Sequence, residues 1–208
     1  MSWSLHALPL HTLDDNLGWD WAAGVSFSHG LPDHPPQPQA LPTATQVLAA
    51  FTSAGCHGQA WFTLEAGDAS EGLLPCPDPA GCAGRGGLDL GEVTLRPAGS
   101  RAPAERLAAS TLVTAIGFRK PYYRAVLAGI SGLTAAAGPL LILDNEADMA
   151  FVVHEGDQLE DLAAHWPWRA FWHAPDEQGP RQSGHCARVL EPGVTWPTGW
   201  PLTGPATC

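Results

Sequence analysis

The chain has 208 residues and 45% of them are hydrophobic, so it is long enough for one sizeable core and too apolar to be a disordered chain. Its net charge is −11 and it has only ten Lys and Arg residues, with no basic run longer than Arg119 and Lys120. Because a nucleic-acid binder clusters cations to neutralise phosphates, this composition excludes nucleic acid as an expected ligand.

The first 42 residues are expected to form an irregular segment rich in Trp, His and Pro, with one strand at residues 23–28. Residues 29–42 predict a loop, because their prolines lack backbone donors and favour an extended backbone. Thr43 and Gln46 match the capping-box pattern, which predicts a helix over residues 44–54 with Gly55 as its stop.

Two strands are predicted next. Residues 59–65 alternate between apolar and polar side chains, which is typical of a half-buried strand. In residues 88–95 the parity of the apolar side chains changes at Gly91, between the pairs Leu88, Leu90 and Val93, Leu95. We therefore expect a β-bulge at Gly91 that turns both pairs toward one core. The loop of about 20 residues between these strands is unusually long, and such loops are commonly functional or disordered.

A helix is then predicted from Pro103, which suits a first helical turn, to Gly117. An apolar stripe at helical spacing, which ends with Val113 and Ile116, indicates this helix.

A second helix is predicted from Pro121 to Gly138, with Val126 and Ile130 on its inner face. Gly129 and Gly132 weaken this helix by about 1 kcal/mol each relative to Ala. Their expected purpose is close contact with a neighbouring helix or with the sheet.

The apolar runs 140–143 and 150–153 predict two buried strands of a hairpin joined by a short acidic turn. A helix should follow, with Asp157 as its N-cap and Glu160 three residues later as an acidic capping box. Residues 167–208 predict an irregular tail rich in Trp and Pro, with one strand at residues 187–190.

These elements predict one α+β domain over residues 1–208. Its sheet should be antiparallel or mixed, with about four to six strands and about four helices packed mainly on one face. Long loops rich in Pro, Gly and Trp should connect the elements. No glycine-rich phosphate-binding pattern lies between a strand and a helix, so a nucleotide-binding α/β fold is not expected.

The acids are concentrated between residues 144 and 161, where seven of the 21 lie and where no Lys or Arg occurs. Their negative field favours a basic protein partner, bound through Asp144, Glu146, Asp148 and Glu155. The leading hypothesis is therefore a cytoplasmic protein-interaction module. By analogy, a bacterial immunity-type inhibitor that neutralises a basic toxin or enzyme would have this size, this acidity and this lack of catalytic motifs.

The cysteines and histidines raise the alternative of a zinc-dependent enzyme. Its ligands would come from Cys56, Cys76, Cys82 and Cys186, supported by the dipeptides at 56–57 and 185–186. The C-x5-C spacing differs from the usual zinc pattern of two C-x2–4-C pairs, so we expect no metal and no cofactor. A disulfide between Cys76 and Cys82 is a further alternative. The odd total of five cysteines favours reduced thiols.

Nine tryptophans leave a third hypothesis open, in which exposed Trp side chains bind a carbohydrate or another small ligand. Buried tryptophans that hold the tail on the core are the simpler interpretation. The start of the chain shows no signal-peptide pattern, and no run approaches the ~20 apolar residues of a membrane span. We therefore expect a cytoplasmic protein with no membrane partner.

Overall fold

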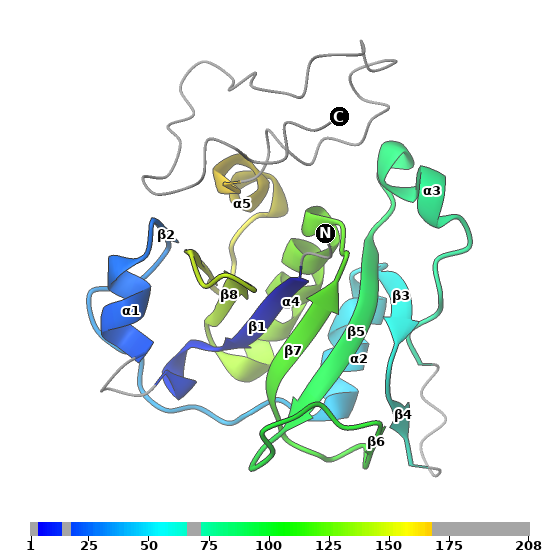
Figure 1. Ribbon diagram of the computed structural model, residues 1–208, viewed down its shortest axis with the longest axis horizontal. Coiled ribbons are helices and arrows are strands. Elements are labelled where there is room, and N and C mark those ends of the chain that lie inside the picture. Colours follow the sequence, from blue (N-terminus) through cyan, green and yellow to red (C-terminus); the bar gives the residue numbers. More distant parts are fainter. Residues whose placement is uncertain (1–3, 14–17, 66–71, 168–208) are drawn as a thin grey trace.

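A computed structural model describes residues 4–13, 18–65 and 72–167, which build a mixed seven-stranded sheet and a small two-stranded one (Figure 1). The large sheet has the order β2-β9-β8-β1-β7-β5-β3. Its strands, in chain order, are β1 (Ser4–Pro9), β2 (Phe27–His29), β3 (His57–Ala60), β5 (Asp89–Pro97), β7 (Val113–Arg119), β8 (Leu140–Asp144) and β9 (Met149–Val153). The small sheet pairs β4 (Thr63–Leu64) with β6 (Arg106–Leu107).

Pairing is antiparallel in the interior of the large sheet and parallel at both of its edges, where β2 pairs with β9 and β3 pairs with β5. The helices are α1 (Gly18–Gly24), α2 (Ala44–Ser53), the single turn α3 (Pro79–Cys82), α4 (Tyr123–Ala137) and α5 (Leu159–His165). Short 3-10 turns η1 and η2 span Leu10–Thr12 and Ala83–Arg85. The α+β class is confirmed, although the sheet has more strands than expected.

Three helices cover one face of the large sheet, and α2 and α4 lie behind it in Figure 1. The main core fills this layer with apolar side chains from α2, α4, α5 and the strands. A second, smaller core lies on the opposite face, where Ala22 of α1 packs with Leu141 and Val152 of the β8–β9 hairpin. The prediction that helices lie mainly on one face is therefore confirmed.

The expectation that residues 1–42 are irregular is wrong at Ser4–Pro9, because β1 is the middle strand of the sheet and pairs with both β7 and β8. Leu5 and Ala7 alternate with more exposed neighbours and are fully buried. The strand predicted at 23–28 is also displaced: α1 runs to Gly24, and β2 begins at Phe27.

The helix predicted from Pro103 to Gly117 is wrong, because Val113–Arg119 is strand β7, paired with β1 on one side and β5 on the other. The three-residue spacing of Val113 and Ile116 fits a helix. However, the segment is rich in β-branched and aromatic residues, and a pleated position between two strands satisfies them better.

Several local predictions are confirmed. Thr43 and Gln46 form a reciprocal capping box at the start of α2. Helix α4 ends at Gly138, whose φ is +71°. The hairpin at 140–153 forms as β8 and β9, with Leu141, Phe151 and Val153 fully buried and Leu143 half-buried.

The bulge in β5 is confirmed as well. Three residues of β3, from His57 to Gln59, lie opposite four of β5, from Asp89 to Glu92, and Gly91 has a φ of +65°. As a result Leu90, Val93 and Leu95 are all fully buried in the main core, and Leu88 packs against it. The strand predicted at 59–65 is divided, because the chain leaves the large sheet after Ala60 and enters the small one at Thr63.

The N-cap predicted for the last helix is wrong. Helix α5 begins at Leu159 with Gln158 as its N-cap, and no side chain caps it. Asp157 instead accepts a hydrogen bond from the backbone N–H of His154, and Glu160 forms an ion pair with Arg124 of α4. The strand at 187–190 and most of the tail lie outside the described residues.

Candidate metal centre

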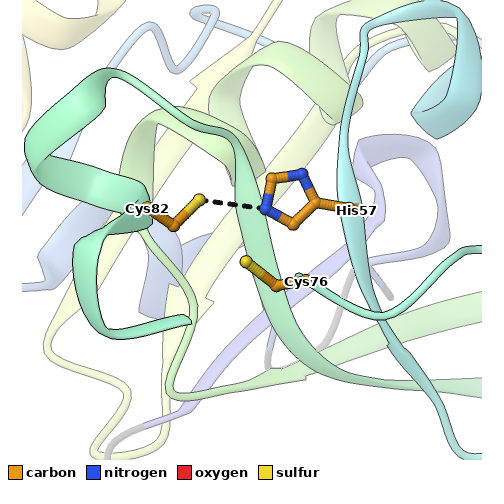
Figure 2. Close-up of side chains that lie close together, drawn as sticks. All are labelled: His57, Cys76 and Cys82. Atoms are coloured by element: carbon orange, nitrogen blue, oxygen red, sulfur yellow. Dashed lines mark hydrogen bonds between the residues drawn. The ribbon is translucent and has the colours of Figure 1, made fainter. Parts of the chain in front are cut away.

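Three metal-binding side chains meet beside the edge strand β3 (Figure 2). His57 is the first residue of β3, Cys76 lies in the connection that leads to α3, and Cys82 is the last residue of α3. His57 Nε2 lies 2.9 Å from Cys82 Sγ, and the three ligand atoms all lie within 4.8 Å of one another. The imidazole and both sulfurs therefore surround one point in space.

Backbone hydrogen bonds hold both flanks of the 72–88 connection against β3. The N–H of His57 donates to Leu88 O at 3.0 Å, and the N–H of Gly58 donates to Leu74 O at 2.8 Å. A Cβ at position 58 would lie 2.8 Å from Gly91 O, so a glycine permits this close approach. Main-chain contacts thus hold the segments that carry the ligands against β3.

The turn formed by α3 and η2 brings Cys82 toward His57. The N–H of Gly87 donates to Cys82 O at 2.8 Å, and a Cβ at position 87 would overlap the Cys82 sulfur. Asp78 accepts a hydrogen bond from Gly81 N and forms an ion pair with Arg85, which closes the turn on its outer side. Because Asp78 and Arg85 are largely exposed, this pair adds little stability.

The pKa of the Cys82 thiol is raised to about 11, mainly by burial and also by the adjacent Cys76 and the Asp89 carboxylate, while Arg85 opposes them. The side chain of Cys82 is 6% exposed, so water stabilises its thiolate poorly. A bound cation would supply the missing stabilisation, because a coordinating thiol is deprotonated by its metal.

The spacing of the ligand atoms is close to that of a tetrahedral zinc site. Bond lengths of about 2.3 Å for Zn–S and about 2.0 Å for Zn–N place neighbouring ligand atoms roughly 3.5–3.8 Å apart. The 2.9 Å contact between His57 and Cys82 would have to open by roughly 0.6 Å to admit the ion. Among the described residues no fourth His, Cys, Asp or Glu joins the cluster. Three protein ligands with one open position are typical of zinc sites that bind water or an exchangeable ligand.

Two of the four cysteines predicted as ligands are brought together, and one is excluded. Cys56 points into the main core, where its Sγ contacts Ala125 O at 3.5 Å and burial raises its pKa to about 12. Cys186 lies outside the described residues. His57 is absent from the predicted ligand set, although the Cys56–His57 dipeptide was expected to support the site. Successive side chains of an extended chain point to opposite sides, so the two residues could not both face the site.

The predicted acidic surface does not form as one array. Asp144 is buried, and its Oδ1 accepts hydrogen bonds from the backbone N–H groups of Asp148 at 2.9 Å and Met149 at 3.2 Å. Glu146 is exposed and Asp148 half-buried in the hairpin turn, whereas Glu155 follows the far end of β9. Because a strand rises about 3.3 Å per residue, β9 separates Glu155 from the turn. Asp144 is thus a structural residue of the turn.

The hairpin turn itself is held firmly. The carboxylate of Asp144 accepts a hydrogen bond from the turn backbone at Asp148, and the indole N–H of Trp21 donates to Ala147 O at 3.0 Å. Asn145 accepts a hydrogen bond from Ser4 N, and Ala147 keeps a φ of +58° that L residues rarely adopt. Glu146 and Asp148 therefore project from a fixed backbone.

The described tryptophans do not form an exposed platform. Trp166 is buried and stacks on Tyr123, while Trp19 and Trp21 pack against the smaller core. Among those described, Trp61 is the exposed one, at 54%. Most members of the tail clusters lie outside the described residues.

No protein-family model, curated protein or solved structure matches this chain. In the part of the chain that the structure describes, no helix has the length and apolar character needed to cross a membrane.

Proposed function

We propose that this protein binds a zinc ion through His57 Nε2 and the Sγ atoms of Cys76 and Cys82. The observation that carries the proposal is the convergence of these three atoms within 4.8 Å from three separate positions of the chain. Two sulfur ligands and one nitrogen suit zinc, whereas calcium and magnesium take oxygen ligands. The bound ion would fasten the 72–88 connection to the sheet edge and offer its fourth position to water or to a small donor ligand.

A reducing compartment agrees with this proposal, because both sulfurs must be thiols before they can bind the ion as thiolates. Cytoplasmic location thus belongs to the same proposal. In that compartment Cys76 and Cys82 would serve as zinc ligands. Their C-x5-C spacing would supply two ligands without the two C-x2–4-C pairs of a usual zinc site.

Zinc content of the purified full-length protein tests the proposal directly. After loading with Zn²⁺ and dialysis we expect close to one ion per chain, by elemental analysis. Cys82→Ser and His57→Asn should each lower the affinity by more than the roughly 10–100-fold that the loss of an outer-shell partner costs. The matched control is Cys56→Ser, which removes a neighbouring thiol that faces the core and should retain the ion. Full zinc content in Cys82→Ser, or none in the parent protein, would overturn the proposal.

We also propose that the hairpin turn recognises a basic protein partner, as an immunity-type inhibitor would recognise its target. The supporting observation is the fixed turn, which presents Glu146 and Asp148 without an ion pair to any Lys or Arg of the described residues. A preorganised array of charges loses little entropy on binding and speeds association electrostatically.

Charge reversal at the turn is the appropriate test once a partner has been captured from extracts of the source cell. Glu146→Lys combined with Asp148→Lys should slow association at low salt, and rising salt should slow the parent protein in the same way. The control is Glu155→Lys, which changes the charge beyond the other end of β9. Equal effects at the turn and at Glu155 would show that the acidity serves solubility alone.

A further inference from the structure

We propose that the metal site is also a redox switch, in which a peroxide joins Cys76 and Cys82 in a disulfide and the zinc ion is released. The inference rests on the proposed zinc-binding function and adds a mode of regulation to it. Its starting point is that the two sulfurs belong to one cluster whose ligand atoms lie within 4.8 Å of one another, and both lie near the imidazole ring of His57 (Figure 2).

The sulfurs can approach bonding distance with a small movement of the chain. A disulfide needs an S–S distance of about 2.05 Å, so the gap to close is at most roughly 2.8 Å. Cys76 lies in a stretch, residues 72–78, that contains neither helix nor strand, and Cys82 ends a single helical turn. Neither cysteine lies in a strand of the sheet.

The surroundings select this pair of thiols. Cys76 is half-buried and reachable from solvent, while Cys82 is almost completely covered. Cys56, the other cysteine in the described part of the chain, points into the main core toward Ala125 and away from the cluster. Oxidation of a thiol followed by attack of its neighbour is therefore expected at Cys76 and Cys82.

The chemistry balances with hydrogen peroxide as the two-electron oxidant. The Cys76 sulfur attacks one peroxide oxygen, the O–O bond breaks, and the products are a sulfenic acid and water. The Cys82 sulfur then displaces the sulfenic hydroxyl as hydroxide, which takes up a proton from solvent and leaves as a second water. Two zinc-bound thiolates, one peroxide and two protons from solvent thus give one disulfide and two waters, and the sulfurs lose the two electrons that the peroxide gains.

Release of the ion follows from the ligand count. Thiolates bind zinc through their negative charge, and a disulfide carries none. Among the described residues His57 would then be the one remaining ligand, and a single imidazole holds zinc weakly. Reduction of the disulfide would restore the site.

The experiment uses the zinc-loaded full-length protein with Cys186 and Cys208 replaced by Ser, so that their thiols do not contribute. One equivalent of hydrogen peroxide should remove two thiols and release one Zn²⁺ per disulfide, measured with a colorimetric zinc chelator. Peptide mapping after alkylation should find Cys76 linked to Cys82, and dithiothreitol should restore zinc binding. Cys76→Ser in the same background should form no link, whereas Cys56→Ser should behave like the parent.

The outcomes separate the two proposals. Absence of zinc before the oxidant is added would overturn the proposed function, and with it the release step. Normal zinc binding followed by retention of the ion would overturn the redox inference alone. Sulfinic or sulfonic acids at Cys76 or Cys82 without a link between them would overturn it as well.

Discussion

Gly129 of α4 lies against the ring of Phe51 of α2: a Cβ at position 129 would lie 2.7 Å from Phe51 Cδ1 and 3.0 Å from its Cε1. Phe51 is fully buried and also packs at a tilt against Phe118 of β7, so its ring has little room to withdraw. The glycine thus permits the close approach of two helices, as the sequence indicated.

This contact predicts that Gly129→Ala destabilises the protein although Ala is the better helix former. Overpacking costs about 1–3 kcal/mol and should outweigh the roughly 1 kcal/mol gained in helix propensity. Gly132→Ala is the matched control on the same helix, because its Cβ would meet Ala50 O at 3.3 Å, a tight contact without overlap. Urea unfolding of both variants would check this, and a Gly129→Ala protein that is as stable as Gly132→Ala would contradict it.

The bulge in β5 makes a second prediction, at Gly91. Its φ of +65° would strain an alanine, and an added Cβ would overlap Arg119 O and lie 2.8 Å from Lys120 O. Gly55 has a similar φ of +73°, but a Cβ there would meet no atom within 4 Å. Backbone strain of about 1–3 kcal/mol destabilises both alanine variants. Any further loss of unfolding free energy in Gly91→Ala therefore measures the overlap of its Cβ with the neighbouring carbonyl oxygens. Equal thermal midpoints for the two would contradict this account of the bulge.

The sequence predicts the structure correctly where local chemistry and tertiary packing favour the same result. Three such features depend on neighbouring residues alone: the capping box of Thr43 and Gln46, the helix end at Gly138 and the bulge at Gly91. The prediction failed at β7, because the spacing of Val113 and Ile116 matches a helical stripe, whereas pairing with β1 and β5 places the segment in the sheet. Strand β1 was missed for a similar reason, since six residues give too short a pattern to show their place in the sheet.

The sequence predicted two of the three ligands of the candidate metal site. Cys76 and Cys82 were identified from their spacing, but the choice between Cys56 and His57 depended on which of them the core would cover. The contact of Cys56 with Ala125 of α4 settles that choice, and it joins residues 69 positions apart. No local pattern carries such information.

Asp144 gives the third prediction, because its carboxylate holds the hairpin turn. Asp144→Ala would remove the acceptor of two backbone hydrogen bonds, and the loss of unfolding free energy should be about 2–4 kcal/mol. Asp144→Asn keeps one oxygen acceptor and should cost less. Glu146→Ala, two residues away and exposed, should change stability by less than about 0.5 kcal/mol. Chemical denaturation would contradict this if Asp144→Ala and Glu146→Ala were equally stable.

The last prediction concerns a histidine cluster between β2 and α5. His29 stacks on Phe151 at 4.7 Å and on His165 at 4.6 Å, and the imidazole of His154 contacts Gly30 O at 2.6 Å. Burial lowers the pKa of His29, the adjacent His165 and His154 lower it further, and Asp157 opposes them. Burial also lowers the pKa values of His6 and His11.

A lowered pKa means that the unfolded chain binds more protons than the folded protein near the ordinary histidine value of 6.5. Stability should therefore be level above about pH 7.5, fall as the pH drops through 6.5, and level off below the pKa of the folded state. His29→Phe keeps a ring for the stacking and removes the titration, so its urea midpoint should fall less between pH 7.5 and 5.5 than that of the parent. It should still fall in part, because His6 and His11 remain. An equal fall in both proteins would show that charging of His29 does not contribute to the acid sensitivity of the fold.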